Sequence, residues 1–287
     1  MAGDPADNES LGSPILGGRS NLALRVVSSL VLAPFAIAVA YFGDLAFLAF
    51  WSAAAIIVLW EWDTLVCAHD RNSVLTVGVV ALVGASWMLW ADRPGIAVAL
   101  AVLGAFGVAG LASRIRRFWC TAGVFYAAVL VVAPVTLRND AAFGFAAVLF
   151  LFVIVWLTDI SAYFAGRAIG GPKLMPRISP KKTWSGAIGG TVVGTMAGVA
   201  VASQMGARSL IAITLVAVVL SVAAQAGDLV ESAIKRKFNA KDASQLIPGH
   251  GGLMDRVDGF VAAALAATLI GLAHGGIAAP ARGLMIW

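Results

Sequence analysis

The chain has 287 residues, of which 60% are hydrophobic and only 12% are charged. Soluble domains carry about 25% charged residues, so this composition excludes an ordinary soluble protein and indicates one that crosses a membrane repeatedly. The net charge of +5 comes from cations in short loops between apolar runs, which argues against a nucleic-acid partner and instead reports membrane topology. The two cysteines, Cys67 and Cys120, are too few for a disulfide framework, and we interpret both as small apolar residues.

The N-terminal segment, residues 1–20, is polar and rich in Gly, Pro, Asp and Ser. Such a segment has too little apolar surface to bury, so it predicts a disordered tail. It also lacks the positively charged start and the small-residue cleavage site of a signal peptide. We therefore expect no cleaved leader.

Nine apolar runs are long enough to cross a bilayer, which takes about 20 residues of helix. They predict an all-α polytopic membrane protein with about nine transmembrane helices, over residues 24–42, 45–65, 74–90, 95–111, 118–137, 141–165, 184–204, 210–226 and 257–274. Only Gly43 and Asp44 separate the first two runs, so these two can also be counted as one.

The nine runs divide the chain into two regions. The N-terminal region, residues 21–140, has little polar chemistry, and we expect it to be a scaffold or a dimer contact. A few ionisable residues near the end of its second run are interpreted as solvated loop charges: Glu61, Asp63, His69 and Asp70. The C-terminal region, residues 141–287, has two polar loops and is expected to be catalytic.

The positions of Lys and Arg predict the orientation in the membrane. With nine spans, all but four of the 20 Lys and Arg residues lie on the side of the N-terminus; the exceptions are Arg93, Arg138, Arg208 and Arg282. Cytoplasmic loops carry an excess of these residues. The N-terminus is therefore predicted to be cytoplasmic and the C-terminus to lie on the opposite side. The polar loops after the sixth and eighth spans then face the cytoplasm together, at the inner membrane.

The first polar cluster lies at the end of the sixth span. Asp159, Tyr163 and Arg167 recur at a spacing of four residues, so they share one face of a helix. Asp159 follows a long apolar run, and an ionisable group within the membrane is costly and therefore a functional candidate. The alternative is that Asp159 pairs with Tyr163 or Arg167 and only locks the helix.

The loop that follows contains several Gly and Pro residues and then the sequence SPKKT, residues 179–183. Ser179, Thr183 and the free amides at the start of the next helix can bind an anion, and Lys181 and Lys182 add positive charge. The loop has no Walker motif. The alternative is that the lysines only contact lipid headgroups.

The second polar cluster follows the eighth span. Asp228, Glu231, Ser232 and Lys235 fall on one stripe of a helix. Two carboxylates on a stripe can bind a hard cation, and Lys235 can contact a metal-bound phosphate. The alternative is an ordinary Glu231–Lys235 pair on a solvated face.

Two further acids, Asp255 and Asp258, stand at the start of the ninth span. Acidic residues are also favoured there by the helix dipole alone. Together with Asp228 and Glu231 they are predicted to bind one or two Mg²⁺ ions beside substrate phosphates, with an additional monovalent ion left open. His250, in a tight PGHGG turn, is either a base or a structural residue of the turn, and a single His does not make a zinc site.

Residues 232–258, SAIKRKFNAKDASQLIPGHGGLMDRVD, resemble the signature of the phosphatidate cytidylyltransferases, also called CDP-diacylglycerol synthases. Asp159, Tyr163, Gly166, Arg167 and the SPKKT segment are similar to the upstream motif of that family. One position departs from the pattern: family members often carry Glu where this chain has Ser185. A contact assigned to that Glu is therefore not carried over.

The resemblance implies the reaction of CTP with phosphatidic acid, giving CDP-diacylglycerol and pyrophosphate with Mg²⁺, in a homodimer. The lipid phosphate would attack the α-phosphorus of CTP in line. The catalytic residues we predict are Asp228, Lys235, Lys241, Asp255, Arg256 and Asp258. The substrate-binding residues we predict are Asp159, Arg167, Ser179, Lys181, Lys182, Thr183, Arg236 and His250. The metal ligands we predict are Asp228, Asp255, Glu231 and Asp258.

Two other functions fit parts of the sequence. A CTP-dependent lipid-alcohol kinase would use the same nucleotide but release CDP. An ion-coupled transporter would also need acids in the membrane, but the acids of this chain cluster at one end of the spans instead of crossing the bilayer in series.

Overall fold

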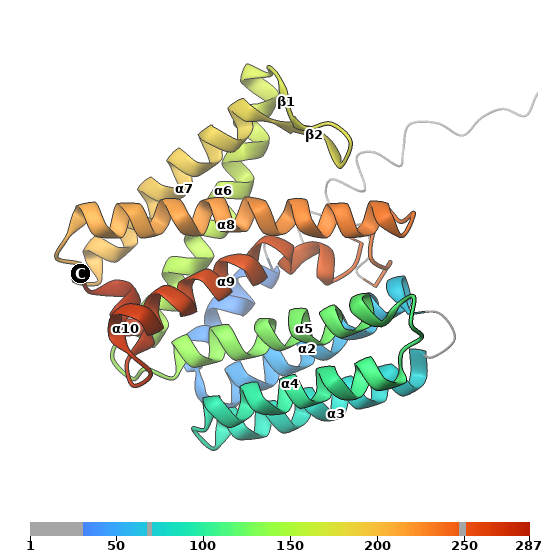
Figure 1. The fold of residues 1–287 in the computed structure, drawn as a ribbon. Helices are drawn as coiled ribbons and strands as arrows, with labels where there is room; N and C mark the ends of the chain where they lie inside the picture. Colours follow the sequence, from blue (N-terminus) through green and yellow to red (C-terminus); the bar gives the residue numbers. More distant parts are fainter. Residues whose placement is uncertain (1–30, 68–70, 247–250) are drawn as a thin grey trace, which may run out of the picture.

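The computed structural model of the chain describes residues 31–67, 71–246 and 251–287. It is built almost entirely of helices (Figure 1). After a helical segment at Val31–Phe42, the helices are α2 (Asp44–Val66), α3 (Arg71–Trp90), α4 (Pro94–Leu111), α5 (Arg117–Arg138), α6 (Gly144–Ile169), α7 (Trp184–Gln204), α8 (Leu210–Lys237), α9 (Met254–Gly275) and α10 (Pro280–Met285).

Eight of the described helices, α2 to α9, are long and apolar enough to cross a membrane. Each overlaps one of the second to ninth predicted spans, so the prediction of an all-α polytopic membrane protein is confirmed. The first predicted span, residues 24–42, lies partly outside the described residues. Its described part is the shorter apolar helix Val31–Phe42.

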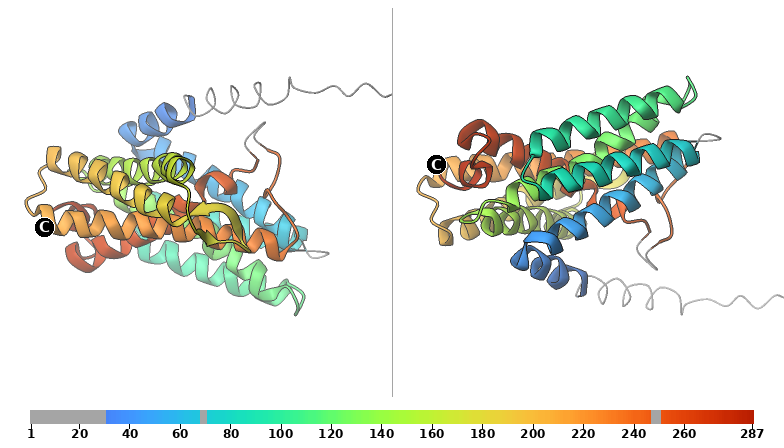
Figure 2. Two further views of the ribbon diagram at one scale, coloured as in Figure 1. Left: turned by 90° about the horizontal axis from the view of Figure 1, so that it is seen from above. Right: turned by 90° about the horizontal axis from the view of Figure 1, so that it is seen from below.

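The helices form two groups. Helices α2 to α5 pack as one antiparallel group, while α6 and α7 form a close pair that carries the hairpin at its end (Figure 1). Helix α9 packs against both α5 and α8. In Figure 2 the α6–α7 pair lies on the face seen from above, and α3 and α4 lie on the face seen from below.

An aromatic cluster fills the space where α2 of the first group meets α6 and α9. The Trp51 ring of α2 stacks on the Phe260 ring of α9 with centroids 4.6 Å apart, and Phe152 of α6 lies 5.5 Å from Phe260. Trp51, Phe152 and Phe260 are all buried. Helices from both groups therefore share one core, where close aromatic packing adds to the burial of apolar area.

The loop predicted after α6 contains regular structure that the sequence did not indicate. It forms an antiparallel hairpin of β1 (Lys173–Met175) and β2 (Ser179–Thr183), with Lys173 opposite Thr183. Helix α6 ends at its C-cap residue Gly170, whose φ is 68°. A positive φ is costly for any residue with a Cβ, so glycine suits this position. The hairpin places the SPKKT segment beside the end of α6.

Helix α8 extends well beyond the predicted end of its span at residue 226. It continues to Lys237 because the polar residues after Gly227 include no helix-breaking proline. Gly227 itself packs against α9, where an added Cβ would lie 2.6 Å from the carbonyl oxygen of Asp258. The polar stripe of α8 is therefore held on a continuous helix beside the start of α9.

The cysteines pair with each other, contrary to our interpretation of two independent apolar residues. Both are buried, and the structure joins Cys67 at the end of α2 to Cys120 in the first turn of α5. A guanidinium N–H of Arg116 also donates to the carbonyl oxygen of Val66 at 3.0 Å. These contacts bring the end of α2 and the start of α5 together.

Candidate active site

A cavity of about 580 Å³ lies where the two predicted polar clusters meet. Its lining comes from α6, the hairpin, α7, α8 and α9. Nine predicted site residues line it: Asp159, Arg167, Lys181, Lys182, Thr183, Asp228, Asp255, Arg256 and Asp258. The structure therefore brings together side chains that are about 100 residues apart in the sequence.

Helix α6 forms one wall of the cavity with Asp159, Tyr163 and Arg167. Their shared helical face is confirmed. An Arg167 N–H donates to the Tyr163 hydroxyl at 3.3 Å, and among the described residues no ion pair joins Arg167 to Asp159. Asp159 is therefore presented to the cavity and is not locked to its own helix by Arg167.

The hairpin forms the second wall. Thr183 caps α7, since its hydroxyl oxygen accepts a hydrogen bond from the Gly186 N–H at 3.1 Å, as N-cap residues commonly do. The Ser185 hydroxyl donates to the carbonyl oxygen of Gly170, so the residue that departs from the family pattern ties α7 to the end of α6. Ser179 is half-buried at the start of β2 and does not line the cavity.

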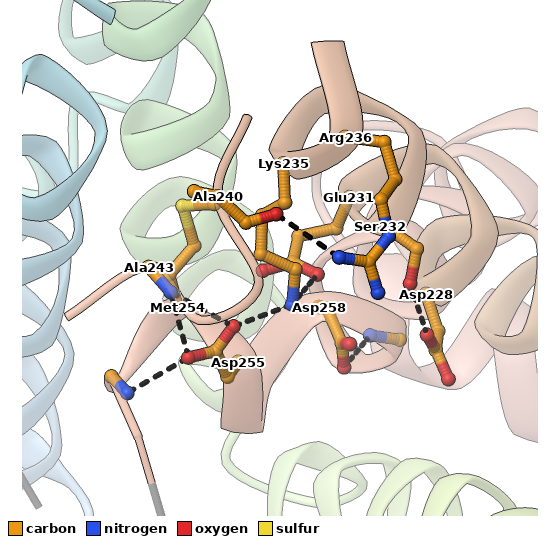
Figure 3. A network of polar contacts seen from close by, with 12 residues as sticks. Asp228, Glu231, Ser232, Lys235, Arg236, Ala240, Ala243, Met254, Asp255 and Asp258 are labelled. Carbon is orange, nitrogen blue, oxygen red and sulfur yellow. Dashed lines mark hydrogen bonds and ion pairs between the residues drawn. The ribbon is translucent and has the colours of Figure 1, made fainter. Parts of the chain in front are cut away.

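The Lys182 ammonium forms an ion pair with the Asp228 carboxylate of α8. The other Asp228 oxygen accepts a hydrogen bond from the Ser232 hydroxyl at 3.3 Å, one turn further along the helix (Figure 3). This ion pair links the first polar cluster to the second. It places a cation and a carboxylate side by side at the cavity wall.

Lys235 joins the carboxylates of Glu231 and Asp255 (Figure 3). Its ammonium lies 2.6 Å from a Glu231 oxygen and 2.5 Å from an Asp255 oxygen, and the side chains of all three are at most 11% exposed. The Glu231–Lys235 pair exists, as our structural alternative proposed, but it is buried and not on a solvated face. Lys235 itself does not line the cavity.

Asp255 organises the loop that precedes α9. One carboxylate oxygen accepts the N–H groups of Gly252 at 2.8 Å and Ala243 at 3.0 Å, and the other binds Lys235. Asp258 accepts a hydrogen bond from the Gly259 N–H at 2.7 Å and lines the cavity. Asp255 therefore has several protein donors, whereas Asp258 engages fewer of them (Figure 3).

Our interpretation of Glu61 and Asp63 as solvated charges is wrong, because both side chains are fully buried. The Glu61 carboxylate accepts the N–H groups of Leu253 at 2.9 Å and Met254 at 2.6 Å. The physical reason is that α9 and its preceding loop cover this end of α2. His69 and Asp70 lie outside the described residues.

Besides Ser179, Glu231 and Lys235, two further predicted residues, Arg236 and Lys241, do not line the cavity. Arg236 is exposed and donates to the carbonyl oxygens of Ile178 at 3.5 Å and Ala240 at 3.2 Å. Lys241 is exposed in the loop after α8, away from the cavity lining. His250 lies outside the described residues.

Gln225 and Lys173 also line the cavity but were missed in the sequence. Gln225 donates through its amide nitrogen to the Thr191 hydroxyl at 2.9 Å. A polar side chain inside the predicted span 210–226 was the available signal, by the same reasoning that selected Asp159. Lys173 gave no such signal, since the hairpin that positions it was not predicted.

The carboxylate oxygens around the cavity fit Mg²⁺ only if the ion takes few ligands from the protein, as it usually does. Within residues 31–67, 71–246 and 251–287, no three His, Cys, Asp or Glu side chains form a group that could hold a metal ion. Mg²⁺ commonly takes one or two carboxylates and completes its shell with water and substrate phosphates. Asp159, Asp228 and Asp258 offer oxygen atoms of this kind to the cavity. The metal therefore stays a prediction.

Comparison with known proteins identifies the family. Residues 23–273 match the model described as "Cytidylyltransferase family". The phosphatidate cytidylyltransferase of Brucella abortus biovar 1 is 42% identical over 258 residues, which cover 88% of this chain and 94% of that protein. That of Haemophilus influenzae is 31% identical over 277 residues, covering 84% and 96%. The resemblance found in the signature is confirmed, and the chain belongs to the cytidylyltransferase family.

Proposed function

We propose that this protein is a phosphatidate cytidylyltransferase, which transfers the cytidylyl group of CTP to phosphatidic acid and forms CDP-diacylglycerol and pyrophosphate. The observation that carries this proposal is the cavity in which carboxylates and cations of both signature segments meet. It lies at one end of a group of apolar helices, a position that suits one water-soluble substrate and one lipid. The named relatives support the same activity.

The proposed reaction is an in-line displacement at phosphorus. An oxygen of the lipid phosphate forms a bond to the α-phosphorus of CTP, and the bond from that phosphorus to the oxygen bridging to the β-phosphate breaks. Pyrophosphate leaves with the bonding electrons. Because the attacking phosphate is already ionised, catalysis rests mainly on positioning and on neutralising charge.

The cations of the cavity are assigned to the phosphates. Lys181, Lys182 and Arg256 line it from the hairpin and from α9, and each would bind phosphate oxygens. Lys182 would exchange its contact with Asp228 for one with substrate, which leaves the carboxylate free to bind a cation. Lys235, held by Glu231 and Asp255, would position the start of α9.

Asp228 and Asp258 are the residues that would hold Mg²⁺, with Asp159 as a third acid on the opposite wall. When bound, the ion supplies positive charge that stabilises the triphosphate and the leaving pyrophosphate. Glu231 and Asp255 are assigned to holding Lys235 and the loop instead of the metal, because one Glu231 oxygen pairs with Lys235 and both Asp255 oxygens accept protein donors.

We also propose that the protein is integral to the cytoplasmic membrane, with its N-terminus and the cavity on the cytoplasmic side and its C-terminus opposite. The distribution of Lys and Arg supports this orientation. A homodimer is proposed from the family resemblance, and cross-linking in native membranes would test it.

The deciding experiment incubates the purified protein with labelled CTP and phosphatidic acid in detergent. Labelled CDP-diacylglycerol together with pyrophosphate is the expected outcome, and an Asp228→Asn variant gives the background. Release of CDP with phosphorylation of a lipid alcohol would indicate the CTP-dependent kinase instead. Substrate flux into proteoliposomes without nucleotide turnover would indicate a transporter.

A further inference from the structure

The start of α9 is capped by a residue of α2, about 190 residues earlier in the sequence. Helix α9 begins at Met254, and its N-cap residue, Leu253, makes no side-chain cap. The first N–H groups of a helix have no partner within the helix and need an acceptor. Here the Glu61 carboxylate of α2 accepts the N–H groups of Leu253 at 2.9 Å and Met254 at 2.6 Å.

Glu61 also holds the loop between α8 and α9. Its Oε1 accepts a hydrogen bond from the Ser244 hydroxyl at 2.5 Å. Asp255 binds the same loop through the N–H groups of Ala243 and Gly252. The loop is therefore fixed at two adjacent points, once by a carboxylate from α2 and once by a carboxylate from α9.

The fit around the Glu61 carboxylate is close. A Cβ added at Gly252 would lie 2.7 Å from its Oε1 and 3.0 Å from its Oε2, which is too short for an ordinary contact. The side chain of Glu61 is fully buried, so the carboxylate cannot move away into solvent. Its negative charge also suits the positive end of α9.

The segment fixed in this way carries much of the cavity wall, since Asp255, Arg256 and Asp258 all line the cavity. We propose that Glu61 is a positioning residue for the transfer reaction: through Leu253 and Met254 it sets the place and orientation of the α9 residues that face the substrates. This inference deepens the proposed function and rests on it. Glu61 itself does not line the cavity, so it acts only through α9.

The test uses the full-length protein purified in detergent. In Glu61→Gln, one carboxylate oxygen becomes an NH₂ group, which accepts no hydrogen bond, so the N–H group of either Leu253 or Met254 loses its acceptor. The kcat for CDP-diacylglycerol formation is expected to fall about 10- to 100-fold, as for other groups that orient a site. Amide hydrogen exchange is expected to accelerate in peptides covering residues 251–258 and to stay unchanged in α3 and α4. A kcat and an exchange rate equal to those of the wild type would overturn the proposal.

Asp63→Asn is the matched control. Asp63 is also a fully buried acid of α2, but its carboxylate contacts the Cys67 sulfur at 3.5 Å on its own helix. Its substitution is expected to leave kcat and the exchange of residues 251–258 at the wild-type level. Equal losses in Asp63→Asn and Glu61→Gln would show a general effect of α2 and would also overturn the proposal.

Gly252→Ala tests the same link without altering α2. The added methyl group should displace the Glu61 carboxylate and lower kcat, whereas in a Glu61→Ala background the space is free and the same substitution should cost nothing further. Independent, additive losses would contradict the proposal. If the Glu61 variants do not fold, Gly252→Ala alone decides. A kcat and an exchange rate in Gly252→Ala equal to those of the wild type would then refute the proposal.

The assay of the wild-type protein separates this inference from the proposed function. If the wild type forms no CDP-diacylglycerol, the proposed function fails. The exchange measurements on Glu61→Gln and Gly252→Ala still decide whether Glu61 holds α9.

Discussion

Lys182 of strand β2 pairs with Asp228 of helix α8 across the wall of the cavity. The two side chains are 29% and 28% exposed, so water screens the pair and its contribution to stability is only about 0–1 kcal/mol. The contact matters because of its position: it is a direct ionic link between the SPKKT segment and the polar stripe of α8.

Lys182→Met should therefore lower activity far more than stability. We expect turnover to fall about 100-fold, because a group that neutralises phosphate charge is lost, while the melting temperature stays nearly constant. Steady-state assays and thermal unfolding in detergent measure the two effects. Arg177→Met is the control, since Arg177 is an exposed cation of the hairpin outside the cavity lining. An equal loss of activity in both variants would contradict the assignment.

Lys235→Met should mainly reduce stability. It leaves the carboxylates of Glu231 and Asp255 buried without their shared cation, and breaking a buried pair from one side costs about 3–5 kcal/mol. The melting temperature should fall well below that of Lys182→Met. Adding Glu231→Gln removes one unpaired charge and should recover part of the loss. Equal melting temperatures for Lys235→Met and Lys182→Met, with no recovery on adding Glu231→Gln, would refute the interpretation.

Asn variants of Asp228, Asp258 and Asp255 should differ in how their activity depends on the Mg²⁺ concentration. Asp228→Asn and Asp258→Asn are expected to raise the Mg²⁺ concentration for half-maximal activity about tenfold or more, as the loss of a metal contact does. Asp255→Asn should lower kcat without that shift, because it loosens the loop at Ala243 and Gly252. Activity should vanish with a chelator and return with Mg²⁺. The same shift in all three variants would place Asp255 at the metal.

Gly190→Ala should destabilise the α6–α7 pair. An added Cβ would lie 2.6 Å from the Thr158 carbonyl oxygen and 2.9 Å from the Ala162 Cβ, and such overpacking costs about 1–3 kcal/mol. Gly110→Ala in α4, where nothing lies within 4 Å of the new methyl group, is the control and should unfold at or above the wild-type temperature. Thermal unfolding of both variants checks the difference.

The sequence predicts the helices and the meeting of the polar clusters well, because hydropathy and the spacing of charges are local signals. Asp159 and Tyr163 share a face for this reason, and Asp228 and Ser232 share another. The sequence does not predict which side chains pair with each other. Lys182 meets Asp228 only because the hairpin places it there, and strands this short, in a segment rich in Gly, Pro and Lys, have no clear sequence pattern.

Glu61 shows why the remaining contacts could not be predicted. Its solvation depends on whether a segment about 190 residues away covers it, and neighbouring residues carry no information about that. Only its position inside an apolar span marked it as costly to leave unpaired. The carboxylates of Glu231 and Asp255 are similar, since nothing in the helix spacing shows that one lysine serves both.

The close contact of α6 and α7 has a consequence for access by lipid. At Gly186, Gly190 and Gly194 an added Cβ would lie within 2.7 Å of atoms of Thr158 or Ala162, so the two backbones touch along the glycine row. An acyl chain cannot pass between helices in such contact. A lipid whose headgroup enters the cavity must therefore approach along a different pair of helices, with its tails outside the α6–α7 seam.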